Sequence, residues 1–147
     1  MEQTVYRHKV QYYETDQMKI VHHSNYIRWF EEARTDFLDK SGFSYAWMEE
    51  HGIIIPVLSV AAEYKSMVHY GEEVLIYPIV ESFNGVRLGI RYEIKDSQSG
   101  ELKTTGTSSH CFLDAQYRPL RLKKEFPEVY QMFMDSMRPA YSLISQK

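Results

Sequence analysis

The sequence predicts an α+β protein in which one antiparallel β-sheet covers a single long α-helix. An amphipathic helical pattern occupies the region between Ser24 and Gly42, one extended segment precedes it at residues 5–13, and four extended segments with turn signals follow it. This order of elements is that of an α+β domain, and we expect one domain over residues 1–147.

The helix has recognisable ends and one apolar face. Ser24 or Asn25 can act as the N-cap, and Gly42 stands where a left-handed C-terminal cap is needed, which gives a helix of about four turns. The residues spaced to form one buried stripe are aromatic or small: Tyr26, Phe30, Ala33 and Phe37.

The strand pattern is strongest in "VRLGIRYEIK", where apolar and polar residues alternate. Asn84-Gly85 predicts a tight hairpin between this strand and "EVLIYPIVES", and "DSQSG" predicts the next reversal. Pro78 lacks an N–H donor, so its strand should lie near an edge or carry a bulge. A second amphipathic helix is expected in "EFPEVYQMFMDSM", where helical spacing places four residues on one face: Phe126, Tyr130, Phe133 and Met137.

Composition excludes several classes of protein. The 17 basic and 20 acidic residues are dispersed, which argues against nucleic-acid binding. The longest apolar stretch, "IIIPVLSVAA", is too short to insert across a bilayer, and the N-terminus lacks an apolar signal core, so we expect a cytoplasmic protein. Cys111 is the only cysteine, and we expect it to pack rather than react. No metal motif or phosphate-binding loop occurs, and no cofactor is expected.

Polar residues gather where the long helix begins, in "ETDQMKIVHHSNY". A helix N-terminus presents unpaired N–H groups and a partial positive charge, which suits an oxygen that becomes negative during acyl transfer. Asp16 could activate water or attack a carbonyl itself, and His23 could orient water, bond the carbonyl oxygen or relay a proton. The residues alone leave these roles open, and a loop or capping role for Asp16 is the alternative.

The segment "YYETDQMKIVHHSNYIRWFEEAR", together with the later "YKSMVHYGEEV", resembles the signature of hotdog-fold acyl-CoA thioesterases related to 4-hydroxybenzoyl-CoA thioesterase. The resemblance extends over roughly residues 4–135. It implies a hotdog fold, hydrolysis of an acyl-CoA or acyl-carrier-protein thioester, and a homodimer or homotetramer with sites between subunits.

The resemblance also implies roles for individual residues. Asp16 takes the place of the catalytic carboxylate and His23 that of a site histidine, whose backbone N–H would polarise the thioester carbonyl. Where many relatives have glycine the chain has Lys19, so we expect a reshaped loop that avoids positive φ.

Substrate contacts are predicted for four further residues: Asn25, Tyr26, Arg87 and Arg91. The two arginines would meet CoA phosphates, although a solvated surface position is the alternative for both. Two alternative functions remain open: a hydratase or dehydratase of acyl thioesters on the same fold, and a non-catalytic protein that binds acyl thioesters.

Overall fold

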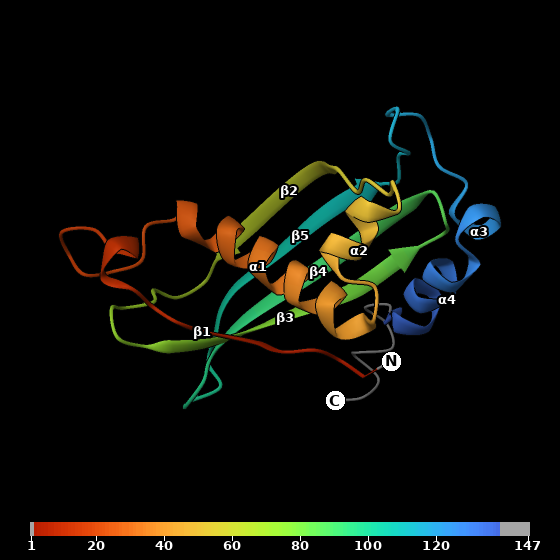
Figure 1. The fold of residues 1–147 in the computed structure, drawn as a ribbon. Coiled ribbons are helices and arrows are strands. Elements are labelled where there is room, and N and C mark those ends of the chain that lie inside the picture. The colour runs from red at the N-terminus through yellow and green to blue at the C-terminus, as the bar shows by residue number, and fades with distance from the viewer. Residues whose placement is uncertain (1, 139–147) are drawn as a thin grey trace.

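In the computed structural model, which describes residues 2–138, an antiparallel β-sheet curves around the long helix α1 (Figure 1). The predicted α+β architecture is therefore confirmed. The elements in chain order are β1 (Tyr6–Lys9), a short 3₁₀ turn (Tyr12–Glu14), α1 (Ser24–Ser41), α2 (Tyr45–Glu50), β2 (Val57–Tyr64), β3 (Glu73–Phe83), β4 (Arg87–Asp96), β5 (Leu102–Cys111), α3 (Leu122–Glu125) and α4 (Pro127–Ser136).

The sheet has five strands in the order β1-β3-β4-β5-β2, and every pair is antiparallel. Both predicted hairpins, β3–β4 and β4–β5, are present. In the first, only Gly85 adopts positive φ, at 88°. Asn84 contributes its side chain instead, because its Oδ1 accepts hydrogen bonds from the backbone N–H groups of Val86 and Arg87.

Pro78 lies where its missing donor costs little. β1 pairs with β3 only along Glu73–Ile76, so the outer side of β3 is unpaired at Pro78. The prediction that this strand lies near an edge or carries a bulge is confirmed, because β3 is next to the edge strand β1 and a register shift follows between Val80 and Ser82. The Gln3 side chain donates to the Pro78 carbonyl over 2.7 Å and thereby covers this part of the edge.

The apolar stripe of α1 is buried as predicted, and Gly42 closes the helix at φ 92°. The predicted N-cap is wrong. The N-cap is His23, and it makes no capping side-chain hydrogen bond. Its backbone is already in the right-handed helical region, and the Ser24 hydroxyl bonds His22 Nδ1 at 2.9 Å instead of capping.

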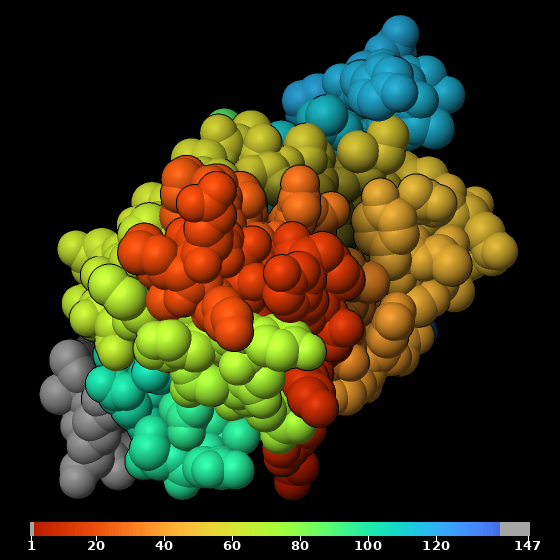
Figure 2. Space-filling model, turned by 90° about the vertical axis from the view of Figure 1, so that its left-hand side faces the viewer, coloured from red at the N-terminus to blue at the C-terminus, as the bar shows by residue number. Residues whose placement is uncertain are grey.

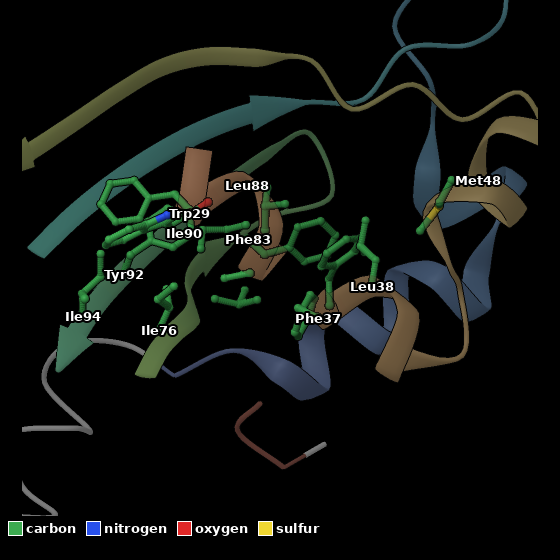
Figure 3. Packing of buried hydrophobic residues seen from close by; sticks show 14 of the residues in the cluster. Trp29, Phe37, Leu38, Met48, Ile76, Phe83, Leu88, Ile90, Tyr92 and Ile94 are labelled. Atoms are coloured by element: carbon green, nitrogen blue, oxygen red, sulfur yellow. The ribbon is translucent and has the colours of Figure 1, made fainter. Parts of the chain in front are cut away.

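The core lies between α1 and the inner face of the sheet (Figure 3). Phe30 stacks on Tyr92 with 4.4 Å between ring centroids. Gly106 on β5 makes this possible, because a Cβ at that position would occupy the space of the Phe30 ring. The helix can therefore approach the sheet closely at this point.

Helices at the far end of α1 close the core. The sequence patterns did not predict α2 or the short α3, whereas the C-terminal helix is confirmed as α4. Its most buried face differs from the predicted one and consists of Val129, Met132, Phe133 and Ser136. Across residues 2–138, no helix is long and apolar enough to cross a membrane.

Candidate active site

The segment that joins β1 to α1 forms one end of the molecule, next to the loop between β2 and β3 (Figure 2). Bridges pair Thr15 with Val21 and Ile20 with His69, and the Val21 N–H donates to the Val68 carbonyl over 2.8 Å. Residues 15–21 are thus a small hairpin, held by backbone hydrogen bonds against the later loop.

Asp16 stands in this hairpin with its side chain exposed to solvent. Its N–H donates to the Ile20 carbonyl over 2.9 Å, and its Oδ1 accepts from the Met18 N–H over 2.8 Å. No donor in residues 2–138 bonds the second carboxylate oxygen, Oδ2. The carboxylate is therefore oriented through one oxygen and available through the other.

The expectation that Lys19 avoids positive φ is wrong. Lys19 adopts the left-handed conformation, with φ 63°. The Lys19 N–H donates to the Asp16 carbonyl, and the Lys19 carbonyl accepts from the Tyr70 N–H, each over 2.9 Å. These bonds close the turn, and they outweigh a strain on the order of 1 kcal/mol for a non-glycine residue.

His22 and His23 are both exposed at the start of α1. Their rings lie 4.2 Å apart at a tilt of 31°, and the His23 ring lies 6.5 Å from that of Tyr64. The His23 N–H has no acceptor within residues 2–138, which leaves a backbone donor free at the helix N-terminus. The described part of the chain contains no group of side chains that could hold a metal ion.

Asn25 and Tyr26 lie beneath this surface. Asn25 is buried, and its Nδ2 donates to the carbonyls of Glu14 and His22. The Tyr26 ring packs 5.0 Å from Tyr64, and burial raises the pKa of its phenol. These contacts point to shaping of the site, while direct substrate contact by either residue stays a prediction.

The two predicted arginines lie elsewhere on the molecule. Arg87 begins β4, and β4 begins at the end of the sheet opposite to the segment that joins β1 to α1 (Figure 1). There it lines a surface groove of about 570 Å³ with Arg121, Lys123 and Lys124. Arg91 is partly buried and pairs with Glu81 and Glu93. Within one chain, therefore, neither arginine meets Asp16. Cys111 also lines the groove, half-buried rather than within the core.

A cavity of about 550 Å³ lies between α1, α2 and the sheet. Its apolar lining includes Met48, Ile53 and Ile90, and Arg34 is its partly buried cation. From Arg34 a buried hydrogen-bond chain runs through the hydroxyls of Tyr92 and Ser108 to His110. Burial, helped by the charge of Arg34, lowers the pKa of His110 to about 4.

Sequence reasoning missed two residues of the site. Tyr64 reaches the helix entrance from β2, and no local pattern links residues so far apart in the chain. Glu14 is buried directly before the Asp16 hairpin. A carboxylate two positions ahead of Asp16 was a visible signal, but the alternation of β1 does not predict that it points inward.

Comparisons with known proteins agree with this geometry. The family model of the thioesterase-like superfamily matches residues 10–134. A Bacillus subtilis (strain 168) protein named "Putative acyl-CoA thioesterase YneP" is 39% identical over 121 residues, which cover 82% of this chain and 87% of that protein. A "Putative esterase" of Aquifex aeolicus (strain VF5) is 35% identical over 109 residues, covering 74% and 84%.

Comparison with a solved structure supports the fold. The DHNA-CoA thioesterase from Staphylococcus aureus superposes with a TM-score of 0.84 at 37% sequence identity, covering 92% of this chain and 91% of that one. The family model spans far more than half of the chain, and the described fold is the one that the resemblance implied. The chain therefore belongs to the thioesterase-like superfamily and is a hotdog-fold thioesterase.

Proposed function

We propose that the chain hydrolyses an acyl-CoA thioester to a carboxylic acid and CoA, with Asp16 as general base or nucleophile. The observation that carries this proposal is the Asp16 carboxylate, which is exposed and held through one oxygen in a hairpin leading into the N-terminus of α1. An oriented carboxylate with a free oxygen suits either role.

The negative charge that develops on the carbonyl oxygen during the reaction needs a hydrogen-bond donor to stabilise it. The unbonded His23 N–H at the start of α1 supplies one, and the helix dipole adds a partial positive charge. As water or the carboxylate adds to the carbonyl carbon, the oxygen would gain negative charge next to this donor. The exposed His23 ring would orient the attacking water or pass a proton to the departing sulfur.

On the general-base route, water is the nucleophile and the CoA thiolate is the leaving group. Asp16 takes a proton from water, the hydroxyl oxygen bonds the carbonyl carbon, and the carbon–sulfur bond breaks to release the CoA thiolate. A thiolate is stable enough to leave without a strong acid. On the nucleophile route an acyl-Asp16 anhydride forms first, and water then hydrolyses it.

A homodimer through β2 fits both the site and the substrate. β2 is an edge strand with an exposed surface, on which Val57, Leu58 and Val60 are 49%, 51% and 40% accessible. Long apolar edge strands usually acquire a partner. If two copies of β2 paired antiparallel about a two-fold axis, the Tyr64 end of one strand would lie beside the Val57 end of the other.

This pairing would bring distant features together. Tyr64 contacts the helix entrance that carries His23, and Val57 lines the apolar cavity. The Asp16 end of one subunit would then face the cavity of its partner, which would receive the acyl group. The basic groove at Arg87 would lie next to that cavity, which the neighbouring Leu88 lines, and would bind CoA phosphates. The ion pairs of Arg91 make it the weaker phosphate ligand.

A thiol-release assay over a panel of acyl thioesters tests the proposal. The panel should hold aliphatic and aromatic acyl-CoAs, among them 1,4-dihydroxy-2-naphthoyl-CoA because of the Staphylococcus aureus relative, and acyl-carrier-protein esters. We expect turnover with at least one acyl-CoA. Hydration of an enoyl-CoA or dehydration of a hydroxyacyl-CoA, followed by the enoyl absorbance and without thiol release, would favour a hydratase or dehydratase. Binding without any turnover would favour a non-catalytic protein.

A further inference from the structure

Glu14 is a buried carboxylate that the proposed reaction does not use. It is 5% exposed, and three groups surround its oxygens. Oε1 accepts from the Gln11 N–H and lies next to His8 Nε2, both at 2.8 Å, while Oε2 accepts from Trp29 Nε1 at 2.7 Å. Burial alone would raise the pKa of Glu14, but these hydrogen bonds together lower it, so the side chain is held as an anion.

The backbone of Glu14 is held as firmly as its side chain. Its carbonyl accepts from the His22 N–H and from Asn25 Nδ2, each over 2.9 Å. Two of its links therefore reach the entrance of α1, and a third reaches Trp29 one turn further along. His8 adds a link to β1. Because Asp16 follows two residues later, Glu14 links the start of the Asp16 hairpin to the helix, while the loop between β2 and β3 holds the rest of the hairpin.

We propose that Glu14 is a positioning residue that fixes Asp16 relative to the free donor at the N-terminus of α1. This inference rests on the proposed function, because it requires Asp16 to react. Catalysis depends on such placement: a shift of about 1 Å at a reacting group can cost about 100-fold in rate. A reacting carboxylate on an exposed hairpin needs a rigid support beneath it, and Glu14 supplies one.

The position calls for a carboxylate in particular. The Gln11 N–H and the indole N–H of Trp29 are obligate donors, and they bond different oxygens of Glu14. A glutamine would present its NH₂ group to one of these donors, so that hydrogen bond would be lost and the segment would shift. The charge also strengthens each remaining bond.

The direct test is Glu14→Gln in the full chain, assayed with the best acyl-CoA of the panel at a temperature at which the variant is folded. We expect kcat to fall by about 10- to 100-fold with KM within about twofold, since binding groups are untouched while the reacting group is displaced. Trp29→Phe removes one donor to the same carboxylate and should lower kcat in the same way, which covers the case in which Glu14→Gln does not fold.

Glu32→Gln is the matched control. Glu32 lies beside the other nitrogen of His8, at 3.6 Å, but it is exposed, and within residues 2–138 it forms no hydrogen bond or ion pair with the Asp16 segment. We expect this variant to keep wild-type kcat. Wild-type kcat in both Glu14→Gln and Trp29→Phe would overturn the proposal. So would a fall in kcat that follows only the loss of folded protein, measured by circular dichroism.

A double-mutant cycle with Asp16→Asn separates positioning from general structural support. If Glu14 acts through Asp16, Glu14→Gln should lower kcat in the wild-type chain and have little effect in the Asp16→Asn chain. Equal fold-losses in both chains would overturn the positioning role and leave Asp16 as a catalytic residue. Full activity of Asp16→Asn by itself would overturn the catalytic assignment, and the positioning of Asp16 would fall with it.

Discussion

At the scale of single residues, the Asp16 hairpin places a strained backbone next to the proposed reacting group. Lys19 in the left-handed region and the oriented carboxylate of Asp16 belong to the same turn, because the Lys19 N–H bonds the Asp16 carbonyl. Strained backbone near a reacting group persists only where surrounding contacts hold it. Here the bonds from Tyr70 to the Lys19 carbonyl and between Asp16 and Ile20 provide that hold.

The strain at Lys19 predicts a stabilising substitution. Lys19→Gly should raise stability by about 0.5–1 kcal/mol, because glycine adopts φ 63° without a Cβ clash, and Tm should rise by about 1–4 °C. Lys19→Ala is the control, since it removes the same charge but keeps the Cβ. Thermal unfolding of both variants checks this. A rise in Tm of the alanine variant as large as that of the glycine variant would show that charge, not conformation, is responsible.

The depressed pKa of His110 predicts a pH dependence of stability. His110 titrates near 4 in the folded chain and near 6.5 when unfolded, so between these values the unfolded state binds more protons. Its stabilising contribution is complete above pH 6.5 and is lost as pH falls towards 4. Between pH 7 and 5 the free energy of unfolding of the wild type should therefore fall by about 2 kcal/mol more than that of His110→Gln. Urea unfolding at both pH values measures this, and equal losses would contradict it.

At the scale of elements, the closest approach between α1 and the sheet depends on one glycine. Gly106→Ala would push a methyl group into the Phe30 ring and towards the Ala61 carbonyl. We expect the free energy of unfolding to fall by about 1–3 kcal/mol. The same change in a Phe30→Leu chain should cost less, because the ring that creates the clash is gone. Denaturant unfolding of the four chains tests this coupling, and identical costs in both backgrounds would contradict the packing account.

The sequence predicted those elements whose pattern is local and periodic. The buried stripe of α1, the left-handed Gly42 and the alternation of β4 all follow from spacing or conformational preference. The N-cap and Lys19 could not be predicted, because hydrogen bonds from the later loop and from His22 override the local preference there. The inward orientation of Glu14 depends on Trp29, and the place of Tyr64 depends on sheet order.

At the scale of the whole molecule, the exposed edge at β2 predicts the assembly. The wild type should sediment at twice the 17.4 kDa chain mass or above. Val60→Lys would place two like charges close together across the two-fold axis, so it should yield a 17.4 kDa species with reduced activity. Lys9→Glu changes an exposed charge on β1, the edge strand opposite to β2, and should leave the mass unchanged. A wild type that sediments only at 17.4 kDa would contradict the dimer.

The kcat of Asp16→Asn for acyl-CoA hydrolysis tests the central claim most directly. Asparagine keeps the size of the side chain and the oxygen that accepts from the Met18 N–H, but it can neither take a proton from water nor attack a carbonyl effectively. We predict that kcat falls by about 100-fold or more with little change in Tm, whereas Asp39→Asn on the exposed face of α1 keeps full activity. Near-wild-type hydrolysis by Asp16→Asn would contradict the assignment of Asp16 as base or nucleophile.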